Sequence, residues 1–523
     1  MKQQPNFLFI ITDQHRADHL GCYGNTVVKT PHIDSLATQG KRWDRFYVAN
    51  PICMPNRASI MTGRMCSVHG ARHNGIPLSK DHTTFVELLK NSGYRTGIIG
   101  KSHLQSFTGL PATNTFEPET GKIAPPPQLR DAIKNNRHST EYDLEKAPAW
   151  DRPLAERING DFYGFEHVEV AADHADQASG DYLLWARQQH PDFDSLTGPD
   201  NALPGSKIEA PQSWRTAVPE ELYSTSWVAE RSSQWLKDAA DNDAPFFLQM
   251  SFPDPHHPFT PPGRYWDMYD SSQVDLPASF GLGDLPPIRA MQEALQQGTD
   301  PRDNQSPFAV TESEARAIIA LTYGMITMID DAIGRVMSQL SDLGLADNTV
   351  VIFTSDHGDY MGDHGLMLKL LLHYQGLIRV PFIWNDPAES STPAIEKGLA
   401  SSIDIASTIL ARAGVQPYNG IQGRDLLSTK APEAIIVEED SQRSMTGFAQ
   451  PQRVRTVVIE RFRMSLRQAE QWGELYDLEN DPHELHNLFD QASARPHRER
   501  LNEIMLRRLI ELQDRSPLPA YRA

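Results

Sequence analysis

A cysteine and an arginine four residues apart form the pair with the clearest capacity for chemistry. Cys53 directly precedes a Met-Pro-Asn-Arg sequence, and Pro55 suits the first turn of a helix because its missing N–H costs nothing there. Gly63 then ends the short helix expected over PNRASIMT. The free N–H groups and the dipole at a helix start favour negative charge, and Arg57 projects towards the same end. These features favour a thiolate nucleophile of lowered pKa or a metal ligand at Cys53 over an inert buried thiol.

Polar clusters follow four apolar runs that are typical of buried strands. These clusters are Asp13-Gln14 after residues 6–12, Lys101-Ser102-His103 after 95–100, His256-His257 after 245–250, and Asp356-His357 after 349–355. In a parallel sheet the ligand crevice lies beyond the carboxyl ends of the strands, so all four clusters are expected to meet at one site. One such cluster alone is usually a turn, whereas a cluster after every one of these strands indicates function.

The residue types within these clusters define the chemistry of the expected site. Asp13, Asp356 and His357 are oxygen and nitrogen donors suited to a divalent cation, and Gln14 lies beside the first of them. The positive charge that a tetrahedral oxyanion needs comes from Arg57, Lys101 and Lys369. Either aspartate alone serves equally well as a cap or turn residue, but together they favour metal binding.

A sheet covered by helices on both faces is needed to position these residues. The runs NFLFIIT, RTGIIG, PFFLQM, TVVIFTS and RVPFIW are continuously apolar rather than alternating, which is typical of a largely parallel sheet in an α/β protein. The clearest helix spans residues 311–344. Thr311 and Glu314 offer a capping box at its start, and Gly344 a stop at its end.

The pattern changes in two places and suggests a division of the chain. Residues 105–225 hold few apolar runs and are expected to form a surface insertion with its own small core, or else a lid over the substrate. After about residue 415, EAIIVEED and RVRTVVIERFRMSL alternate as half-exposed antiparallel strands do, and a final polar helix follows. We expect a catalytic domain over 1–415 and a smaller α+β domain over 416–523.

Composition narrows the classes of function. The chain has 523 residues and a net charge of −19, which argues against binding nucleic acid or an anionic membrane through a broad basic face. No apolar run approaches the roughly 18 residues of a membrane helix, and the N-terminus lacks the pattern of a signal peptide. Three cysteines, an odd number, fit a reducing compartment. We therefore expect a cytoplasmic protein.

Several motifs resemble one known family. Cys53-Met54-Pro55-Asn56-Arg57 is similar to the C-x-P-x-R signature of the sulfatases, within the alkaline-phosphatase-like superfamily. Further resemblances follow in order along the chain: GKSHL at 100–104, PHHPF at 255–259, TSDHGDYMGDHGLMLK at 354–369 and ELYDLENDPHELHNL at 474–488. The resemblance implies a central mixed sheet flanked by helices, with a smaller C-terminal domain that carries a four-stranded antiparallel sheet.

The resemblance also implies a chemistry for the cysteine. A formylglycine-generating enzyme would oxidise Cys53 to an aldehyde, whose hydrate carries two hydroxyls on one carbon. One hydroxyl, deprotonated with help from Arg57, would attack sulfur, and the other would expel sulfate by re-forming the aldehyde. One divalent cation would be held by Asp13, Gln14, the modified Cys53, Asp356 and His357. The remaining roles would fall to Lys101 and Lys369 on sulfate oxygens, His103 in sulfate release, His256 (or, less favoured by position, His257) on the leaving oxygen, and Asn74 on the substrate.

Two departures from the usual sulfatase pattern keep an alternative open. Many sulfatases carry two adjacent carboxylates and an Asp-Asn pair where this chain has Asp13-Gln14 and Asp356-His357. The imidazole shifts the expected metal from Ca²⁺ towards Mn²⁺ and resembles the phosphonate monoester hydrolases and choline-sulfatase-type members. Lys101 and His103 instead resemble the arylsulfatase pair. The balance favours hydrolysis of aryl or alkyl sulfate monoesters, with phosphonate monoester or phosphodiester hydrolysis as the alternative.

Two readings from other classes are weaker. A non-catalytic protein that binds small sulfated ligands through an unmodified Cys53 has no need of so many catalytic groups. A thiol redox protein lacks a partner cysteine, because Cys66 is too distant to form a C-x-x-C pair. The likeness to the phosphonate hydrolase branch also suggests a homo-oligomer.

Overall fold

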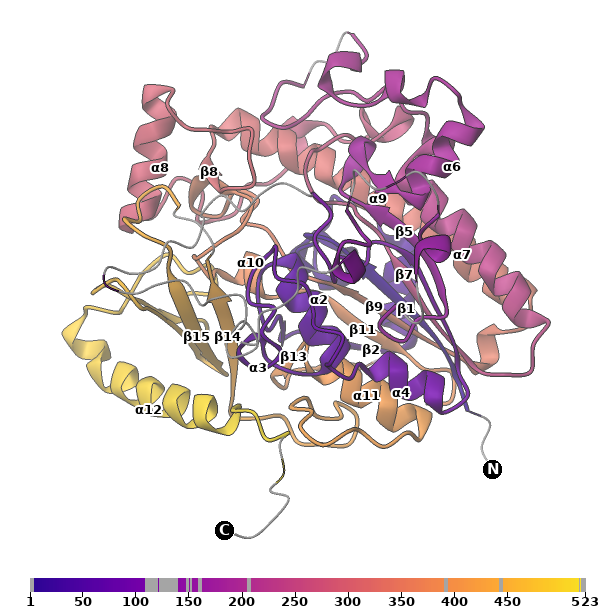
Figure 1. Cartoon of the computed structure of the whole chain (residues 1–523). Coiled ribbons are helices and arrows are strands. Elements are labelled where there is room, and N and C mark those ends of the chain that lie inside the picture. The colour runs from indigo at the N-terminus through magenta and orange to yellow at the C-terminus, as the bar shows by residue number, and fades with distance from the viewer. Residues whose placement is uncertain are drawn as a thin grey trace.

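A mixed sheet of nine strands lies at the centre of the larger part of the protein (Figure 1). The computed structural model describes residues 4–108, 121, 140–146, 150, 153–158, 162–204, 208–389, 394–441, 445–516 and 518. The strand order is β12-β2-β11-β9-β1-β7-β4-β5-β6. Along the chain the strands are β1 Asn6–Thr12, β2 Lys41–Trp43, β4 Arg95–Gly100, β5 His167–Ala172, β6 Ser179–Gly180, β7 Phe246–Ser251, β9 Thr349–Ser355, β11 Phe382–Asn385 and β12 Ala394–Glu396.

The middle of this sheet is parallel, as the continuously apolar runs predicted. β1 pairs in parallel with both β7 and β9, with Phe7 opposite Phe247 on one side and Val350 on the other. β4 pairs in parallel with β7 and β5. β11 instead runs antiparallel to β9, with Ile383 opposite Phe353, so the sheet is mixed. The α/β class and the mixed sheet are therefore confirmed.

Helices cover both faces of the sheet because its strands send alternate side chains to two separate cores. Leu8 and Ile10 of β1 belong to one core, together with helices α1 Pro31–Gln39, α6 Asp181–Gln189, α7 Ser224–Ala240 and α9 Glu312–Asp342. Phe7, Phe9 and Ile11 belong to the other core, together with α2 Cys53–Thr62, α4 Phe85–Asn91 and α11 Asp404–Ala413. Figure 1 shows α7 and α9 on the opposite side of the sheet from α4 and α11.

Helix α9 is the longest helix of the described residues and confirms its predicted caps. Thr311 and Glu314 form the expected capping box, and the left-handed Gly344 follows the last turn. By length and composition α9 is apolar enough to cross a membrane, but 94% of its most apolar 18-residue window is buried inside the protein. Its position is therefore that of a core helix.

The segment 105–225 differs from the insertion with its own core that the sequence suggested. β5 and β6, which lie inside it, extend the central sheet beyond β4. Val168 and Val170 of β5 join the core that contains α2, and Tyr182 of α6 joins the core that contains α9. β5 was not predicted from the sequence because polar residues surround it and its partner strand, β4, is distant in sequence. Residues 109–120 and 122–139 of this segment lie outside the described residues.

The C-terminal part forms a second, four-stranded antiparallel sheet, as expected. Its strands, in spatial and chain order, are β14 Ala434–Asp440, β15 Arg453–Ile459, β16 Phe462–Arg467 and β17 Glu474–Asp477. Helix α12 Arg495–Glu511 packs on β14 and β15. The shorter elements are α3 Cys66–His69, α5 Leu154–Arg157, α8 Pro286–Gln297, α10 Gln375–Ile378, and the strand pairs β3 Phe46–Tyr47 with β13 Ala400–Ser401 and β8 Phe308–Ala309 with β10 Leu366–Met367.

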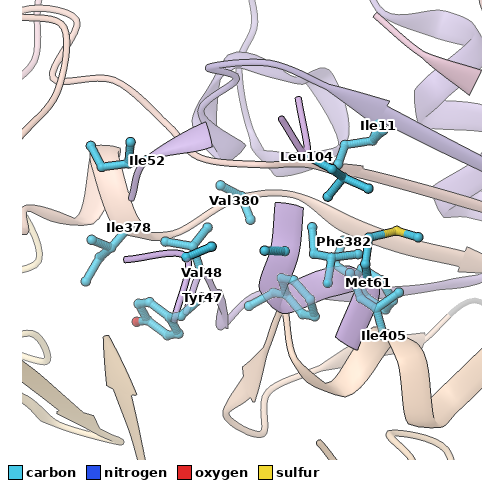
Figure 2. Packing of buried hydrophobic residues seen from close by; sticks show 14 of the residues in the cluster. Ile11, Tyr47, Val48, Ile52, Met61, Leu104, Ile378, Val380, Phe382 and Ile405 are labelled. Carbon is cyan, nitrogen blue, oxygen red and sulfur yellow. The ribbon is translucent and has the colours of Figure 1, made fainter. Parts of the chain in front are cut away.

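Helix α2 is held rigidly because it is buried throughout its length. Its Met61 packs with Ile405 of α11 and Phe382 of β11, and Ile11 of β1 lies nearby in the same cluster (Figure 2). Gly63 ends the helix in the left-handed conformation, as predicted, with its N–H donating to Ser59. A buried helix of fixed direction therefore carries Cys53 at its first position.

Candidate active site

The ends of β1 and β9 bring two aspartates together. These strands are parallel neighbours, so Asp13 and Asp356 follow them at the same edge of the sheet. The backbone N–H of Gln14 donates to Oδ1 of Asp356 at 3.2 Å, with Gln14 in the left-handed region at a φ of 61°. Both aspartates are fully buried. Two carboxylates without access to water require positive charge nearby.

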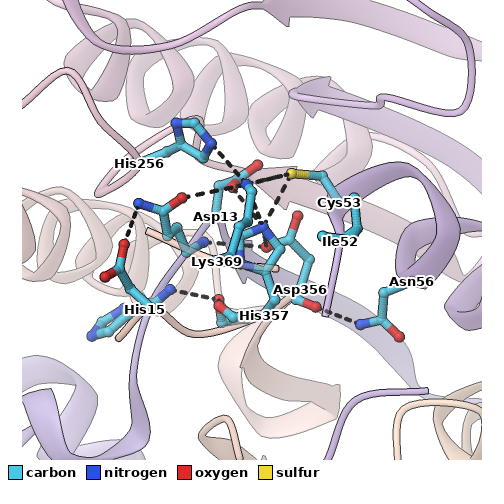
Figure 3. Close-up of polar contacts among 12 residues, drawn as sticks. Asp13, His15, Ile52, Cys53, Asn56, His256, Asp356, His357 and Lys369 are labelled. Carbon is cyan, nitrogen blue, oxygen red and sulfur yellow. Dashed lines mark hydrogen bonds and ion pairs between the residues drawn. The ribbon is translucent and has the colours of Figure 1, made fainter. Parts of the chain in front are cut away.

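Cys53 faces these carboxylates from the start of α2 (Figure 3). Its Sγ lies 3.0 Å from Nε2 of His357, 3.2 Å from Nζ of Lys369 and 3.8 Å from Oδ1 of Asp13. Burial and Asp13 would raise the pKa of the thiol, but Lys369 and His357 outweigh them and lower it below its ordinary value. The side chain at position 53 is therefore placed to carry negative charge.

Arg57 ties the start of α2 to both aspartates. Its Nε donates to Oδ2 of Asp356 at 2.7 Å, and Nη2 lies 3.3 Å from Oδ2 of Asp13. Its Nη1 donates to the backbone carbonyl of Lys101 at 2.8 Å and to the hydroxyl of Ser251 at 3.0 Å. The planar guanidinium thus orients four groups that come from four different strand ends.

The donor set around Cys53 fits a divalent cation. One ligand atom from each of Asp13, Cys53, Asp356 and His357 lies within 4.8 Å of all the others, and all four residues are buried. Nδ1 of His357 donates to the carbonyl of Gly358 at 2.8 Å, which leaves Nε2 directed at the cluster. Two carboxylates, an imidazole and a further side chain are the ligand types that Mn²⁺ and related ions accept.

Gln14 lies next to this donor set. Its amide nitrogen donates to Oδ2 of Asp359 at 2.7 Å, and its amide oxygen accepts from Lys369 at 3.3 Å. The buried Asp359 therefore orients the amide so that its oxygen faces the site.

Two lysines bring positive charge to the site through different partners. Nζ of Lys101 lies 2.5 Å from Oδ2 of Asp13, and both side chains are fully buried. Nζ of Lys369 lies 2.9 Å from Nε2 of His256 and 3.0 Å from Nε2 of His357. Despite burial, Lys101 and Arg57 hold the pKa of Asp13 well below its ordinary value. The arrangement can bind an anion beside Cys53.

The two adjacent histidines have different surroundings. Nδ1 of His256 donates to the carbonyl of His257 at 2.6 Å, so Nε2 is the nitrogen that faces Lys369. The ring of His257 instead lies between Gln14 and Gln305, at 3.1 Å from each. His256 therefore faces the site, and His257 supports the side chain of Gln14.

His103 and Asn74 lie at the margin of this network. His103 has a φ of 55°, and its ring packs against Phe107 with centroids 4.3 Å apart. Burial and then Lys101 lower the pKa of His103 well below its ordinary value. Asn74 accepts the backbone N–H of Met54 at 3.2 Å and lines a small cavity beside Lys369. Asn74 thus fixes the start of the helix and lies at the edge of the site.

His174, which no sequence motif indicated, also lies inside the site. Its Nε2 is 2.5 Å from Nζ of Lys101, and its ring stacks on that of His256 with centroids 3.5 Å apart. Nδ1 lies 3.1 Å from the carboxylate of Asp173. Both residues follow β5, so the rule that polar clusters follow strands would have found them had β5 been recognised.

Fold and site together define a class of protein: a mixed α/β protein whose strand ends carry a buried ligand set suited to a divalent cation and buried cationic side chains suited to an anion. The sulfatase family model matches residues 5–415, and the chain belongs to the sulfatase family. The model for the C-terminal part of N-sulphoglucosamine sulphohydrolase matches residues 362–514. The predicted family is confirmed.

Individual relatives agree with this assignment over nearly the whole chain. An arylsulfatase of Clostridium perfringens is 29% identical over 97% of this chain and 94% of its own length. A multifunctional alkaline phosphatase superfamily protein of Trinickia caryophylli is 28% identical over 81% of this chain and 76% of its own. The crystal structure of a phosphonate monoester hydrolase of Agrobacterium radiobacter superposes with a TM-score of 0.75 at 25% identity, covering 98% of this chain and 97% of that one.

Proposed function

We propose that this protein hydrolyses small sulfate monoesters through a formylglycine formed from Cys53 by a formylglycine-generating enzyme, assisted by one divalent cation. The observation that carries the proposal is the convergence on Cys53 of a cation-ligand set and two buried lysines. Asp13, Asp356, His357 and the modified residue 53 would hold the cation, with Gln14 beside them. Membership of the sulfatase family supports this chemistry.

The cation and the hydrated aldehyde would together supply an alkoxide nucleophile close to neutral pH. Side chains of the protein bind the sulfate group and hold the nucleophile in position. Lys101 and Lys369 bind sulfate oxygens and offset the charge of an anion that approaches two carboxylates. Arg57 holds both carboxylates in place, so the nucleophile keeps its position during attack.

The leaving alcohol receives its proton on the side where His256 lies. Nζ of Lys369 donates to Nε2 of His256 at 2.9 Å, so this pair can pass a proton to the leaving oxygen. The stacked ring of His174 fixes the plane of His256, and its Nε2 holds Lys101. His103 assists sulfate release from the other side.

Phosphonate monoester hydrolysis is the second candidate, and one feature favours it. Asp13 is followed by Gln14, and Asp356 by His357, in place of a second carboxylate and an amide. The likeness to the Agrobacterium radiobacter phosphonate monoester hydrolase supports the same alternative. Both reactions use the same residues, so the chain can serve both with different efficiency.

The first experiment is a mass spectrum of the tryptic peptide FYVANPICMPNR, residues 46–57, from protein made in its native host. Loss of sulfur and two hydrogens with gain of one oxygen identifies formylglycine. The values of kcat/KM for an aryl sulfate and an aryl phosphonate monoester then decide between the two candidates. An intact thiol together with no turnover of either ester would overturn the proposal, and Cys53→Ala serves as the inactive control.

We also propose a cytoplasmic, homo-oligomeric protein. All three cysteines are free, which supports a reducing compartment. Light scattering during size-exclusion chromatography tests the oligomeric state, and a monomer mass would reject it.

A further inference from the structure

Lys369 lies on a loop whose backbone is held in a costly conformation. Leu368, Leu370 and Leu371 have φ values of 70°, 121° and 63°, although none is a glycine. Residues with side chains enter this region at a cost of about 1–3 kcal/mol each and stay there only where their surroundings leave no alternative. The position of the Lys369 ammonium therefore depends on whatever holds the loop.

Contacts from the catalytic part hold the first half of this loop. The N–H of Leu368 donates to Oδ1 of Asp359 at 3.0 Å. The hydroxyl of Tyr360 donates to the carbonyl of Leu370. These two contacts leave both backbone groups of Leu371 to other partners.

The C-terminal sheet supplies those partners. The N–H of Leu371 donates to Oε2 of Glu439 on β14 at 2.8 Å, and its carbonyl accepts from Nη2 of Arg467 on β16 at 2.7 Å. Arg467 is in turn paired with the buried Glu474. A carboxylate and a guanidinium from the second sheet thus bind the two backbone groups of one residue, Leu371, in a loop that belongs to the first.

Glu439 is itself fixed from several directions. It is fully buried, and its Oε2 also accepts from Nε2 of His373 at 3.0 Å. The other nitrogen of His373 lies 2.8 Å from the hydroxyl of Thr456 on β15. Glu439 also lines the small cavity that Lys369, Asn74 and Leu370 border. No contact joins Glu439 to Cys53 among the interactions of the described residues.

We infer that Glu439 is a positioning residue that holds Lys369 against the nucleophile from the C-terminal sheet. The inference rests on the proposed function and extends it: the second sheet is part of the catalytic apparatus. Without Glu439 the N–H of Leu371 is unpaired, the strained loop relaxes, and the ammonium moves away from Cys53 and His256. A displacement of about 1 Å in a positioned group lowers the rate by a factor on the order of 10².

The neighbouring residue on the same strand provides a matched control. Glu438 is also buried, and its carboxylate accepts from the N–H and the hydroxyl of Ser67, each at 2.9 Å. Glu438→Leu and Glu439→Leu therefore remove equivalent buried carboxylates, but only the second touches the Lys369 loop. Glu439→Gln keeps an acceptor oxygen for Leu371 and is the conservative variant.

The test measures kcat and KM for an aryl sulfate with the formylglycine-containing enzyme, together with inorganic sulfate binding by calorimetry. We expect Glu439→Leu to lower kcat by a factor on the order of 10², and Lys369→Met by about 10²–10³. The double variant Glu439→Leu/Lys369→Met should be no slower than Lys369→Met alone, because the two residues act through one group. Glu439→Gln should stay within about threefold of the natural enzyme, since it retains the hydrogen bond.

Three outcomes would overturn the inference. The first is a double variant whose kcat is below that of Lys369→Met by the full factor of the Glu439→Leu change. The others are equal losses of kcat in Glu438→Leu and Glu439→Leu, or an unchanged kcat in Glu439→Leu. Glu439→Asp and Glu438→Asp replace the leucine pair if the latter do not fold. Sulfate binding separates this inference from the proposed function. If the natural protein turns over no sulfate ester, the proposed function fails, while parallel losses of sulfate affinity in Glu439→Leu and Lys369→Met still support the positioning role.

Discussion

Replacing Arg57 by lysine tests how the site neutralises its buried carboxylates. The change keeps the positive charge but exchanges a planar fork for a point charge. Arg57 is 3% exposed and makes four hydrogen bonds, two of them to Asp13 and Asp356. A lysine ammonium carries its three N–H donors on one atom and cannot reproduce the fork that spans Asp13 and Asp356, so at least one of these two buried ion pairs is lost.

The structure sets the size of the effect. Each buried acceptor left unpaired costs about 1–3 kcal/mol, and a broken buried ion pair costs about 3–5 kcal/mol. We therefore expect a loss of about 3–5 kcal/mol in the free energy of unfolding of the metal-free protein. The unfolding entropy of a chain of this length is about 1 kcal/mol per kelvin, so Tm should fall by about 3–5 °C. A bound divalent cation neutralises Asp13 and Asp356 again, so the fall should be smaller with Mn²⁺ than with a chelator.

Calorimetric scans at one fixed rate, with chelator and with saturating Mn²⁺ or Ca²⁺, measure both differences. Arg507→Lys is the control, because Arg507 is 75% exposed and, within the described part of the chain, pairs only with Glu503 on the surface of α12. That change should leave Tm unaltered. A fall of less than about 1 °C in Arg57→Lys with chelator, or an equal fall with and without cation, would refute the reasoning.

Three further predictions concern single side chains. In protein made without the modifying enzyme, iodoacetamide should alkylate Cys53 at lower pH than Cys66, and peptide mass spectra measure this difference. Both thiols are buried, but Lys369 and His357 lower the pKa of Cys53, whereas burial raises the pKa of Cys66. His256→Ala should lower kcat by a factor on the order of 10²–10⁴ for alkyl sulfates and far less for p-nitrophenyl sulfate; equal losses for both would remove its role as proton donor. His174→Ala should lower kcat/KM for aryl sulfates on the order of tenfold, because Lys101 loses an acceptor, and His174→Gln should recover part of it; no recovery would point to the stacking on His256 instead.

Local patterns in the sequence were sufficient for much of the fold. The runs at 6–12, 95–100 and 349–355 form β1, β4 and β9 with the predicted bounds, because continuous burial leaves a continuous apolar signal. The capping box of α9 was equally visible, since it depends on residues three apart. β5 was not predicted because charged residues such as Glu169 interrupt its apolar pattern. Glu169 is paired with Arg231, which lies outside the strand.

For the site, the sequence by itself determined what depends on neighbouring residues, and only the tertiary structure decided what depends on contacts between distant ones. Residue types and their spacing identified the family, the cysteine at a helix start and the polar strand ends, because each of these is a local property of the chain. The orientation of His256 rather than His257 towards Lys369 depends on a contact across 113 residues, and the placement of His174 on Lys101 on a contact across 73. The hold of Glu439 on the Lys369 loop spans 68 residues. Such contacts leave no periodic trace in the sequence, because they arise only where packed sheets bring distant loops together.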